Sequence, residues 1–257
     1  MSTPTPLVTV AVDDGVGQVR LADPRHRNAL SKRLSDDLAA AVAAAIDGGA
    51  AAIVLSAEPP VFCAGGSLEG LLNRDVALAD MYAGHRALIS APVPTIAAVA
   101  GAAVGAGTNL PLACDVVIAA ESARFDPRFL DVGIHPGGGH LWRLAQRVGM
   151  QGAAALVLCG DVLTGAEAAA HGLAWRCVSD SDVEELALAL ARRAAGRPRA
   201  LMARTKQTLR AMAAITSFDE AFAAELQAQE WSVAQPDFAE SVRRVQADLE
   251  ARKVKQR

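Results

Sequence analysis

The stretches Phe62-Cys63-Ala64-Gly65-Gly66-Ser67-Leu68 and Gly101-Ala102-Ala103-Val104-Gly105-Ala106-Gly107-Thr108 decide the fold of this chain. Each one follows an apolar run, residues 51–55 or 95–99, which predicts a buried strand. Residues with little or no side chain leave backbone N–H groups open to a ligand. Two such loops that face each other can aim two N–H donors at one carbonyl oxygen and form an oxyanion hole. Tight turns in an alanine-rich core are the alternative interpretation.

Strands and helices alternate on both sides of these loops. Residues 7–12 and 16–21 are β-like runs joined by Asp13-Asp14-Gly15, which is a hairpin signal. Residues 116–119 predict another buried strand. Residues 28–46 carry an apolar residue at every fourth position and predict a helix that Ser31 can cap, and residues 76–90 predict a polar helix. This alternation indicates the α/β fold class.

From Gly137 on, the chain reads almost entirely as helix, with the strongest stretches at residues 184–193, 200–212, 218–231 and 238–253. Gly196-Arg197-Pro198 is the best boundary signal. We therefore expect an α/β core over residues 1–195 and a helical region over residues 196–257. Trp231 and Phe238 are large anchors in that region, and they fill either its core or a subunit interface.

Composition excludes several classes of protein. The chain has 257 residues, 52% of them hydrophobic, with a net charge of −3 and no strongly basic stripe, so a nucleic-acid partner is not expected. No apolar run reaches the roughly 18 residues that cross a bilayer, so membrane insertion is not expected either. The four cysteines form no CxxC pair, which argues against a metal site or a disulfide framework. The N-terminus lacks a signal-peptide pattern, and a cytoplasmic location is expected.

An ordered set of motifs resembles the crotonase (enoyl-CoA hydratase/isomerase) superfamily over nearly the whole chain. Residues 62–68 are similar to its FCAGxDL motif, residues 23–30 to its RP…RNAL segment, and residues 92–101 to KPVIAAVNG. The last of these continues into residues 105–107 and 112–115, and residues 123–137 resemble the next block. Residues 163–173 resemble LTAxEAxxxGL. Each motif is modest by itself, but their order and spacing are highly specific.

The resemblance implies a spiral of repeated ββα turns followed by a helical trimerisation region, in a homotrimer or a dimer of trimers. It implies an acyl-CoA thioester as substrate and no separate cofactor. Carried over by position, the two N–H donors to the thioester carbonyl are Ala64 and Ala106. Phe238 and Lys253 are candidate contacts from a neighbouring subunit. The coenzyme A moiety would run past residues of two segments, namely Arg25, Asn28, Ala29, Leu30, Gly65, Gly66, Ser67 and Leu68.

Two positions depart from the superfamily. Its hydratases hold and activate water with two glutamates, and Asn109 and Phe129 stand at the corresponding positions here. Asn109 can hydrogen-bond a water molecule but cannot act as a base near neutral pH, and Phe129 can do neither. We therefore expect poor hydration, and another enolate-type reaction such as isomerisation or thioester hydrolysis.

Asp131 and His135 are the candidate acid–base residues in place of the glutamates. Asp131 can also be a solvated or Arg-paired acid, and His135 a loop histidine. His85 and His140 are further candidates, while Cys63 is expected to pack and Ser67 to cap.

The alternative function is a non-catalytic acyl-CoA carrier, which needs the same loops and no acid. A Clp-type serine peptidase on a related spiral is not supported, because Ser, His and Asp do not follow in the required order.

Overall fold

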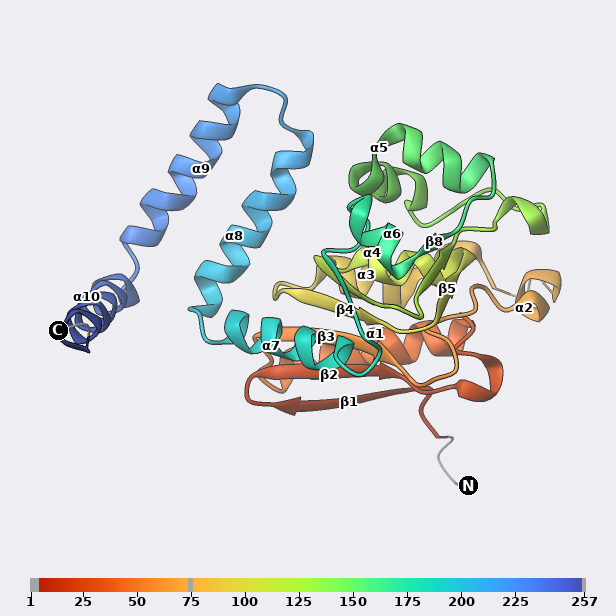
Figure 1. Ribbon diagram of the computed structural model, residues 1–257, viewed down its shortest axis with the longest axis horizontal. Coiled ribbons are helices and arrows are strands. Elements are labelled where there is room, and N and C mark those ends of the chain that lie inside the picture. The colour runs from red at the N-terminus through yellow and green to blue at the C-terminus, as the bar shows by residue number, and fades with distance from the viewer. Residues whose placement is uncertain (1–4, 74–75, 256–257) are drawn as a thin grey trace. The chain divides into compact units, whose positions relative to one another are not determined.

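The computed structural model describes residues 5–73 and 76–255, and the chain forms two compact units, Met1–Gly196 and Arg197–Arg257 (Figure 1). The first unit contains two sheets. The larger sheet has the order β1-β2-β3-β4-β6-β9, and the smaller has the order β5-β7-β8. The strands of the larger sheet are β1 (Val8–Asp13), β2 (Val16–Leu21), β3 (Ala52–Ala57), β4 (Thr95–Val99), β6 (Val116–Ala120) and β9 (Arg176–Val178).

The hairpin β1–β2 is antiparallel, as predicted, and the other neighbours in the larger sheet are parallel. The smaller sheet consists of β5 (Ala102–Val104), β7 (Arg124–Asp126) and β8 (Leu163–Thr164). Each turn of the chain leaves one strand in each sheet before a helix: β4 and β5 precede α4 (Asn109–Ala113), and β6 and β7 precede α5 (His140–Leu158). The predicted α/β class with repeated ββα turns is confirmed.

The spiral brings the two glycine loops together. β3 and β4 are parallel neighbours, so the segments that follow them leave the sheet at the same edge. Cys63 then pairs with Ala103 in a parallel bridge, which extends the smaller sheet into the first loop. The loops therefore occupy equivalent places in successive turns of the spiral.

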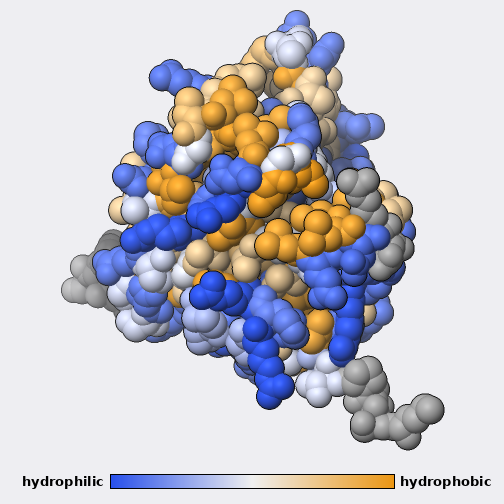
Figure 2. Space-filling view, turned by 90° about the vertical axis from the view of Figure 1, so that its right-hand side faces the viewer, coloured by the Kyte–Doolittle hydropathy of each residue, from blue (hydrophilic) through white to orange (hydrophobic). Residues whose placement is uncertain are grey.

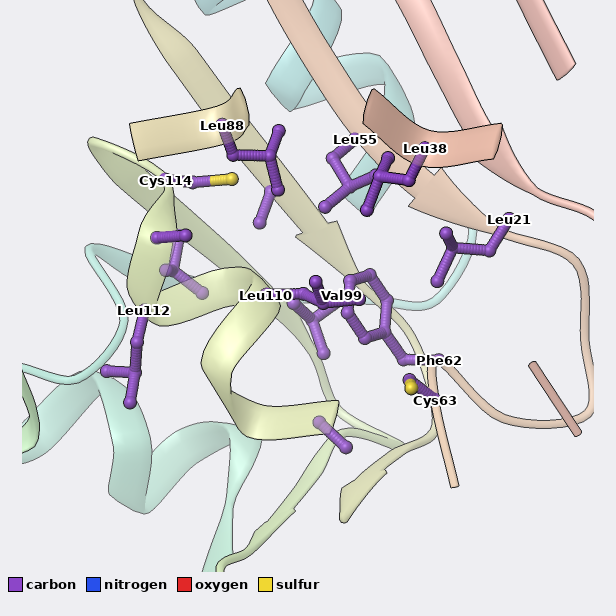
Figure 3. Packing of buried hydrophobic residues seen from close by; sticks show 14 of the residues in the cluster. Leu21, Leu38, Leu55, Phe62, Cys63, Leu88, Val99, Leu110, Leu112 and Cys114 are labelled. Atoms are coloured by element: carbon purple, nitrogen blue, oxygen red, sulfur yellow. The ribbon is translucent and has the colours of Figure 1, made fainter. Parts of the chain in front are cut away.

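Two apolar clusters hold the larger sheet from opposite faces, because successive strand side chains point to opposite sides. Ile53 and Leu55 of β3 face the main core, together with residues of α1 (Lys32–Asp47) and α3 (Ala83–Ser90). Figure 3 shows Leu38, Leu55, Leu88 and Phe62 within this core. Val54, the residue between Ile53 and Leu55, faces α7 (Val183–Ala195) instead.

The predicted helices hold with two corrections. The helix expected from residue 28 begins at Lys32, because Arg27 and Asn28 adopt positive φ angles of 54° and 53°. Ser31 caps it as predicted, since its hydroxyl accepts from the N–H of Leu34 at 3.1 Å. The helix expected over residues 76–90 is split into the 3-10 turn η2 (Leu78–Tyr82) and α3.

Other short elements were not predicted, namely α2 (Leu68–Asn73), α6 (Gly165–Ala170), η1 (Pro24–His26), η3 (Gly105–Thr108), η4 (Leu130–Val132), η5 (Met212–Ala214) and the strands β5, β7, β8 and β9.

The second unit contains the helices α8 (Arg199–Ala211), α9 (Phe218–Val233) and α10 (Asp237–Lys255), close to the predicted ranges. Trp231 is half-buried beneath the guanidinium of Arg204, 5.7 Å from the ring centroid, and Phe238 is exposed. The side chain of Lys253 lies outside the described residues. Among the described helices, none combines the length and the hydropathy of a membrane-spanning segment.

Candidate active site

The first glycine loop pairs with the N-terminal segment that precedes α1. The N–H of Leu30 donates to the carbonyl of Gly65 at 2.7 Å, and the N–H of Ser67 donates to the carbonyl of Leu30 at 2.9 Å. The N–H of Ala64 donates to the carbonyl of Arg27 at 3.0 Å. The prediction that Ala64 offers an unused N–H is therefore wrong, because strand-like pairing already occupies that donor. The N–H of Gly66 lies between the paired positions and has no acceptor within the described chain.

The second glycine loop lies directly against the first. Gly65 has a φ of 96°, and a Cβ added there would lie 2.7 Å from the carbonyl oxygen of Val104 and 3.8 Å from the backbone nitrogen of Ala106. Ala106 stands in the first turn of η3, where helix N–H groups lack intrahelical acceptors. Its N–H meets no acceptor in the described ranges. The geometry therefore leaves two N–H groups, those of Gly66 and Ala106, on adjoining loops.

Asn109 begins α4 just beyond the second loop, and its side chain is already engaged. Its Nδ2 donates to the carbonyl of Gly137 at 3.1 Å, and its Oδ1 lies 2.8 Å from Nδ1 of His140. Asn109 is 1% exposed. The side chain of Asn109 thus binds Gly137 and His140, whereas the sequence led us to expect a hydrogen bond to a water molecule.

Phe129 and His140 are buried against each other. Their rings meet edge to face with centroids 4.8 Å apart. His140 is the first residue of α5 and is only 1% exposed, and its Nε2 has no hydrogen-bond partner within the described chain. Burial, and to a smaller extent the nearby His85, lower the pKa of His140 to about 4. The imidazole thus contacts the side chains of both Asn109 and Phe129.

His85 of α3 lies on the other side of Asn109. Its Nδ1 is 3.1 Å from the carbonyl of Asn109, and its Nε2 is 2.9 Å from the carbonyl of Gly138. Burial and, next, the charge of Arg143 lower the pKa of His85 to about 4, against the opposing effect of its hydrogen bonds to the two carbonyls. A neutral imidazole donates to only one of these carbonyls, so the other contact is unsatisfied.

Asp131 and His135, the predicted acid–base residues, are both exposed. His135 directs Nδ1 at the carbonyl of Pro136, 2.8 Å away. Arg128, the arginine nearest to Asp131 along the chain, pairs with Asp126 through Nε at 2.8 Å. Within the described residues, no contact joins Asp131 or His135 to the Asn109–His140 pair, so the structure does not support their predicted catalytic role.

The residues expected to contact coenzyme A differ in how far they are buried. Arg25 and Leu68 are exposed, Ala29, Gly66 and Ser67 are half-buried, and Leu30 and Gly65 are buried in the pairing described above. Asn28 is fully buried, and its side chain makes three hydrogen bonds, accepting from the N–H of Asp23 and donating to the carbonyls of Glu58 and Val61. A side-chain contact between Asn28 and a ligand is therefore ruled out by its position.

Ser67 and Cys63 match their expected structural roles. The hydroxyl of Ser67 accepts from the N–H of Gly70 at 3.3 Å, in the first turn of α2. Cys63 is fully buried and donates through Sγ to the carbonyl of Asn28 at 3.0 Å. Burial raises the pKa of the Cys63 thiol to about 12, which makes it a poor nucleophile.

Sequence reasoning missed the N–H of Gly66 and the role of Tyr82, and it gave His140 only as a further candidate behind His135. A Cβ on Gly138 would lie 2.5 Å from the ring of Tyr82, so the glycines before His140 admit that ring. The run Gly137-Gly138-Gly139 was therefore a usable signal for close packing beside His140. Within the described ranges, no group of His, Cys, Asp and Glu side chains could hold a metal ion.

A family model and a sequence relative both indicate the same family. Residues 11–255 match the family model of enoyl-CoA hydratase/isomerase. The chain is 40% identical over 243 residues to the "Probable enoyl-CoA hydratase EchA14" of Mycobacterium tuberculosis, covering 90% of this chain and 94% of the relative.

Solved structures are similar as well. A crystal structure of an enoyl-CoA hydratase from Polaromonas matches with a TM-score of 0.86 and 27% identity, over 94% of this chain and 97% of that one. A Thermobifida fusca protein solved in complex with CoA matches with a TM-score of 0.80 and 27% identity, over 89% and 93% of the two chains.

Proposed function

The chain belongs to the enoyl-CoA hydratase/isomerase family of the crotonase superfamily, and we propose that it holds an acyl-CoA thioester carbonyl between the N–H groups of Gly66 and Ala106. The observation that carries the proposal is the approach of the two glycine loops, where the backbone nitrogen of Ala106 lies 3.8 Å from the Cβ position of Gly65. Two donors on one carbonyl oxygen stabilise an enolate or a tetrahedral oxyanion.

The thioester enters as the substrate, and no further cofactor is part of the proposal. Its coenzyme A moiety would pass Arg25, which is exposed, and the backbone of the first loop. The Thermobifida fusca relative in complex with CoA supports this assignment.

The acyl chain has apolar surface available near α2, η4 and the start of α5. The exposed apolar side chains of these elements are Leu68, Leu72, Leu130, Val132, Leu141 and Trp142. Figure 2 shows apolar surface gathered on the face of the molecule toward which α2 points in Figure 1. Exposed apolar patches of this kind mark binding grooves or interfaces.

A non-catalytic carrier is the second candidate, and one observation favours it: the buried side chains at positions 109 and 129 are an amide and a phenyl ring. Titration with butyryl-CoA, which has no double bond to react, tests binding for both candidates. We expect butyryl-CoA to bind more tightly than coenzyme A alone, and equal affinities would contradict a thioester site. Loss of the conjugated absorbance of crotonyl-CoA then separates an enzyme, which consumes it, from a carrier, which does not.

We also propose that the protein assembles as a homotrimer or a dimer of trimers through its C-terminal helices. Apolar side chains are exposed on α8, α9 and α10, among them Leu209, Phe218, Phe222 and Leu249, which are 53% to 80% exposed. Apolar surface of this extent favours burial in an interface. Light scattering after gel filtration measures the mass, and a monomer at micromolar concentration would contradict the assembly.

We propose a cytoplasmic location for the protein as well. The free thiols of all four cysteines support it.

A further inference from the structure

The hydrogen bonds around His140 determine which of its nitrogens carries the proton. Asn109 donates through Nδ2 to the carbonyl of Gly137, so the atom that faces Nδ1 of His140 is the acceptor Oδ1. Thr108 donates its hydroxyl hydrogen to the carbonyl of Gly105 at 2.6 Å and turns a lone pair toward the same Nδ1 at 3.4 Å. Because both neighbours are acceptors, Nδ1 carries the hydrogen and Nε2 carries a lone pair.

The lone pair on Nε2 is buried and meets no donor within the described chain. Buried polar atoms in native proteins ordinarily have partners, and an unsatisfied acceptor costs free energy. Phe129 covers the imidazole without offering a donor. An O–H group, such as that of a water molecule, is a donor that this lone pair can accept from.

His140 contacts the segment that follows the N–H of Ala106. Thr108, which contacts its Nδ1, lies in η3 two residues after Ala106. The ring also contacts the side chain of Phe129 and that of Asn109, which begins α4 just beyond the second glycine loop.

We propose that His140 is the acid–base residue of this site and that the reaction is the hydration of a 2-enoyl thioester. This rests on the proposed function, because the thioester must first be held by Gly66 and Ala106. A lone pair of water forms the O–C3 bond while Nε2 takes a proton from that water. The electrons of the C2=C3 double bond move onto the carbonyl oxygen and form an enolate. The enolate then takes the proton from Nε2 to form the C2–H bond, and His140 returns to its neutral form.

The environment gives this imidazole a suitable basicity. Burial and His85 of α3 lower the pKa of His140 to about 4, close to the ordinary pKa of glutamic acid at about 4.3. Arg143 of α5 is a charged group near His85 and His140, and it lowers the pKa of His85. His140 is therefore a neutral base at pH 7 with roughly the strength of a carboxylate. Asn109 is the positioning residue that keeps the hydrogen on Nδ1.

The first test compares crotonyl-CoA hydration by the wild type, His140→Gln and a matched control, His171→Gln, whose histidine is exposed on the same unit. The affinity for butyryl-CoA is measured for each variant. We expect His140→Gln to lose at least about 100-fold in turnover with unchanged butyryl-CoA affinity, and His171→Gln to match the wild type. Turnover retained in His140→Gln, or a wild type that binds butyryl-CoA without hydrating crotonyl-CoA, overturns the assignment.

A second variant keeps the test independent of how well His140→Gln folds. Asn109→Asp places a carboxylate against the Nδ1 hydrogen and raises the basicity of Nε2. We expect the acidic limb of the turnover profile to move to higher pH by about one unit or more. If His140 is merely structural, the acidic limb of the Asn109→Asp profile stays at the pH of the wild type. An unshifted limb therefore overturns the assignment. A wild type that does not bind butyryl-CoA overturns the proposed function and this inference with it.

Discussion

Gly107 lies so close to Cys63 that a Cβ on Gly107 would stand 2.5 Å from the carbonyl oxygen of Cys63. The same Cβ would lie 2.9 Å from Sγ of Cys63, and Gly107 has no positive φ, so the restriction is one of space alone. It sets how closely the two glycine loops approach, and with that the separation of the N–H groups of Gly66 and Ala106.

Gly107→Ala is expected to push the two loops apart. Overpacking of this kind costs about 1–3 kcal/mol of unfolding free energy, because a backbone carbonyl cannot turn aside as a side chain does. Urea unfolding measures the loss, and titration with butyryl-CoA measures the weaker binding that should accompany it. Gly70→Ala is the control, since a Cβ there meets only ordinary contacts at 3.7 Å. Equal stability and affinity of both variants would contradict the tight contact.

Ala106→Pro removes one N–H group and adds no charge. If that N–H polarises the thioester carbonyl, its loss should lower the rate constant of any enolate-forming reaction by about 10²–10³-fold. Ala106→Ser is the control, because it keeps the N–H and adds only a hydroxyl. Steady-state rates with crotonyl-CoA make the comparison. A proline variant that folds and turns over like the serine variant would exclude Ala106 as a donor.

Asn28→Ala is expected to destabilise the protein without a direct effect on ligand contacts. The substitution leaves three backbone groups without this partner, the buried N–H of Asp23 and the partly buried carbonyls of Glu58 and Val61, and costs on the order of 3 kcal/mol. Thermal or urea unfolding measures this.

Arg25→Ala, three residues away and exposed, is the contrasting variant. Its stability should change by no more than about 0.5 kcal/mol, while its affinity for coenzyme A should fall if Arg25 binds the phosphates as proposed. A stable Asn28→Ala protein with weakened coenzyme A binding would reverse this division of roles.

The two buried histidines predict acid sensitivity. The folded-state pKa of His85 and of His140 is about 4, below the ordinary value of about 6.5, so the unfolded chain binds more protons between these limits. The stability is complete above pH 6.5 and is lost as the pH falls toward 4, by up to about 3 kcal/mol per histidine.

Urea unfolding across this pH range measures the effect. His140→Gln should reduce the slope by about 1.4 kcal/mol per pH unit, the contribution of one proton. Carboxyl groups titrate in the same range and remain in both proteins, so the difference between variant and wild type is the quantity of interest. An unchanged slope would mean that His140 is not held neutral.

The long elements could be predicted because their apolar periodicity reflects burial on one side. The helix that Ser31 caps and the strands before the two glycine loops are of this kind. The strands of two or three residues, β5, β7, β8 and β9, are too short to show a period of two. The start of α1 was misplaced because the positive φ angles of Arg27 and Asn28 depend on tertiary hydrogen bonds to the Asn28 side chain.

The site was predicted in part for similar reasons. Glycine and alanine spacing located both loops, but it could not tell whether the N–H of Ala64 or that of Gly66 is already paired, since pairing depends on a partner strand more than thirty residues away. The sequence placed His135 ahead of His140, and only packing distinguishes the buried His140 from the exposed His135. Asp131 was favoured because it is an acid close to Phe129 along the chain. In the structure its side chain is exposed, and it does not contact Asn109 or His140 within the described residues.

The pairing of the first loop with residues 27–30 has a consequence for how such a chain can diverge. The groups proposed to hold the thioester are peptide N–H groups fixed by strand-like pairing, so ordinary point mutations leave them in place and proline is the main exception. The side chains at positions 109, 129 and 140 carry no such protection. Thioester binding would thus persist as long as the backbone conformation does, while point mutations can change the groups that transfer protons. Related proteins could therefore catalyse different reactions on the same class of ligand.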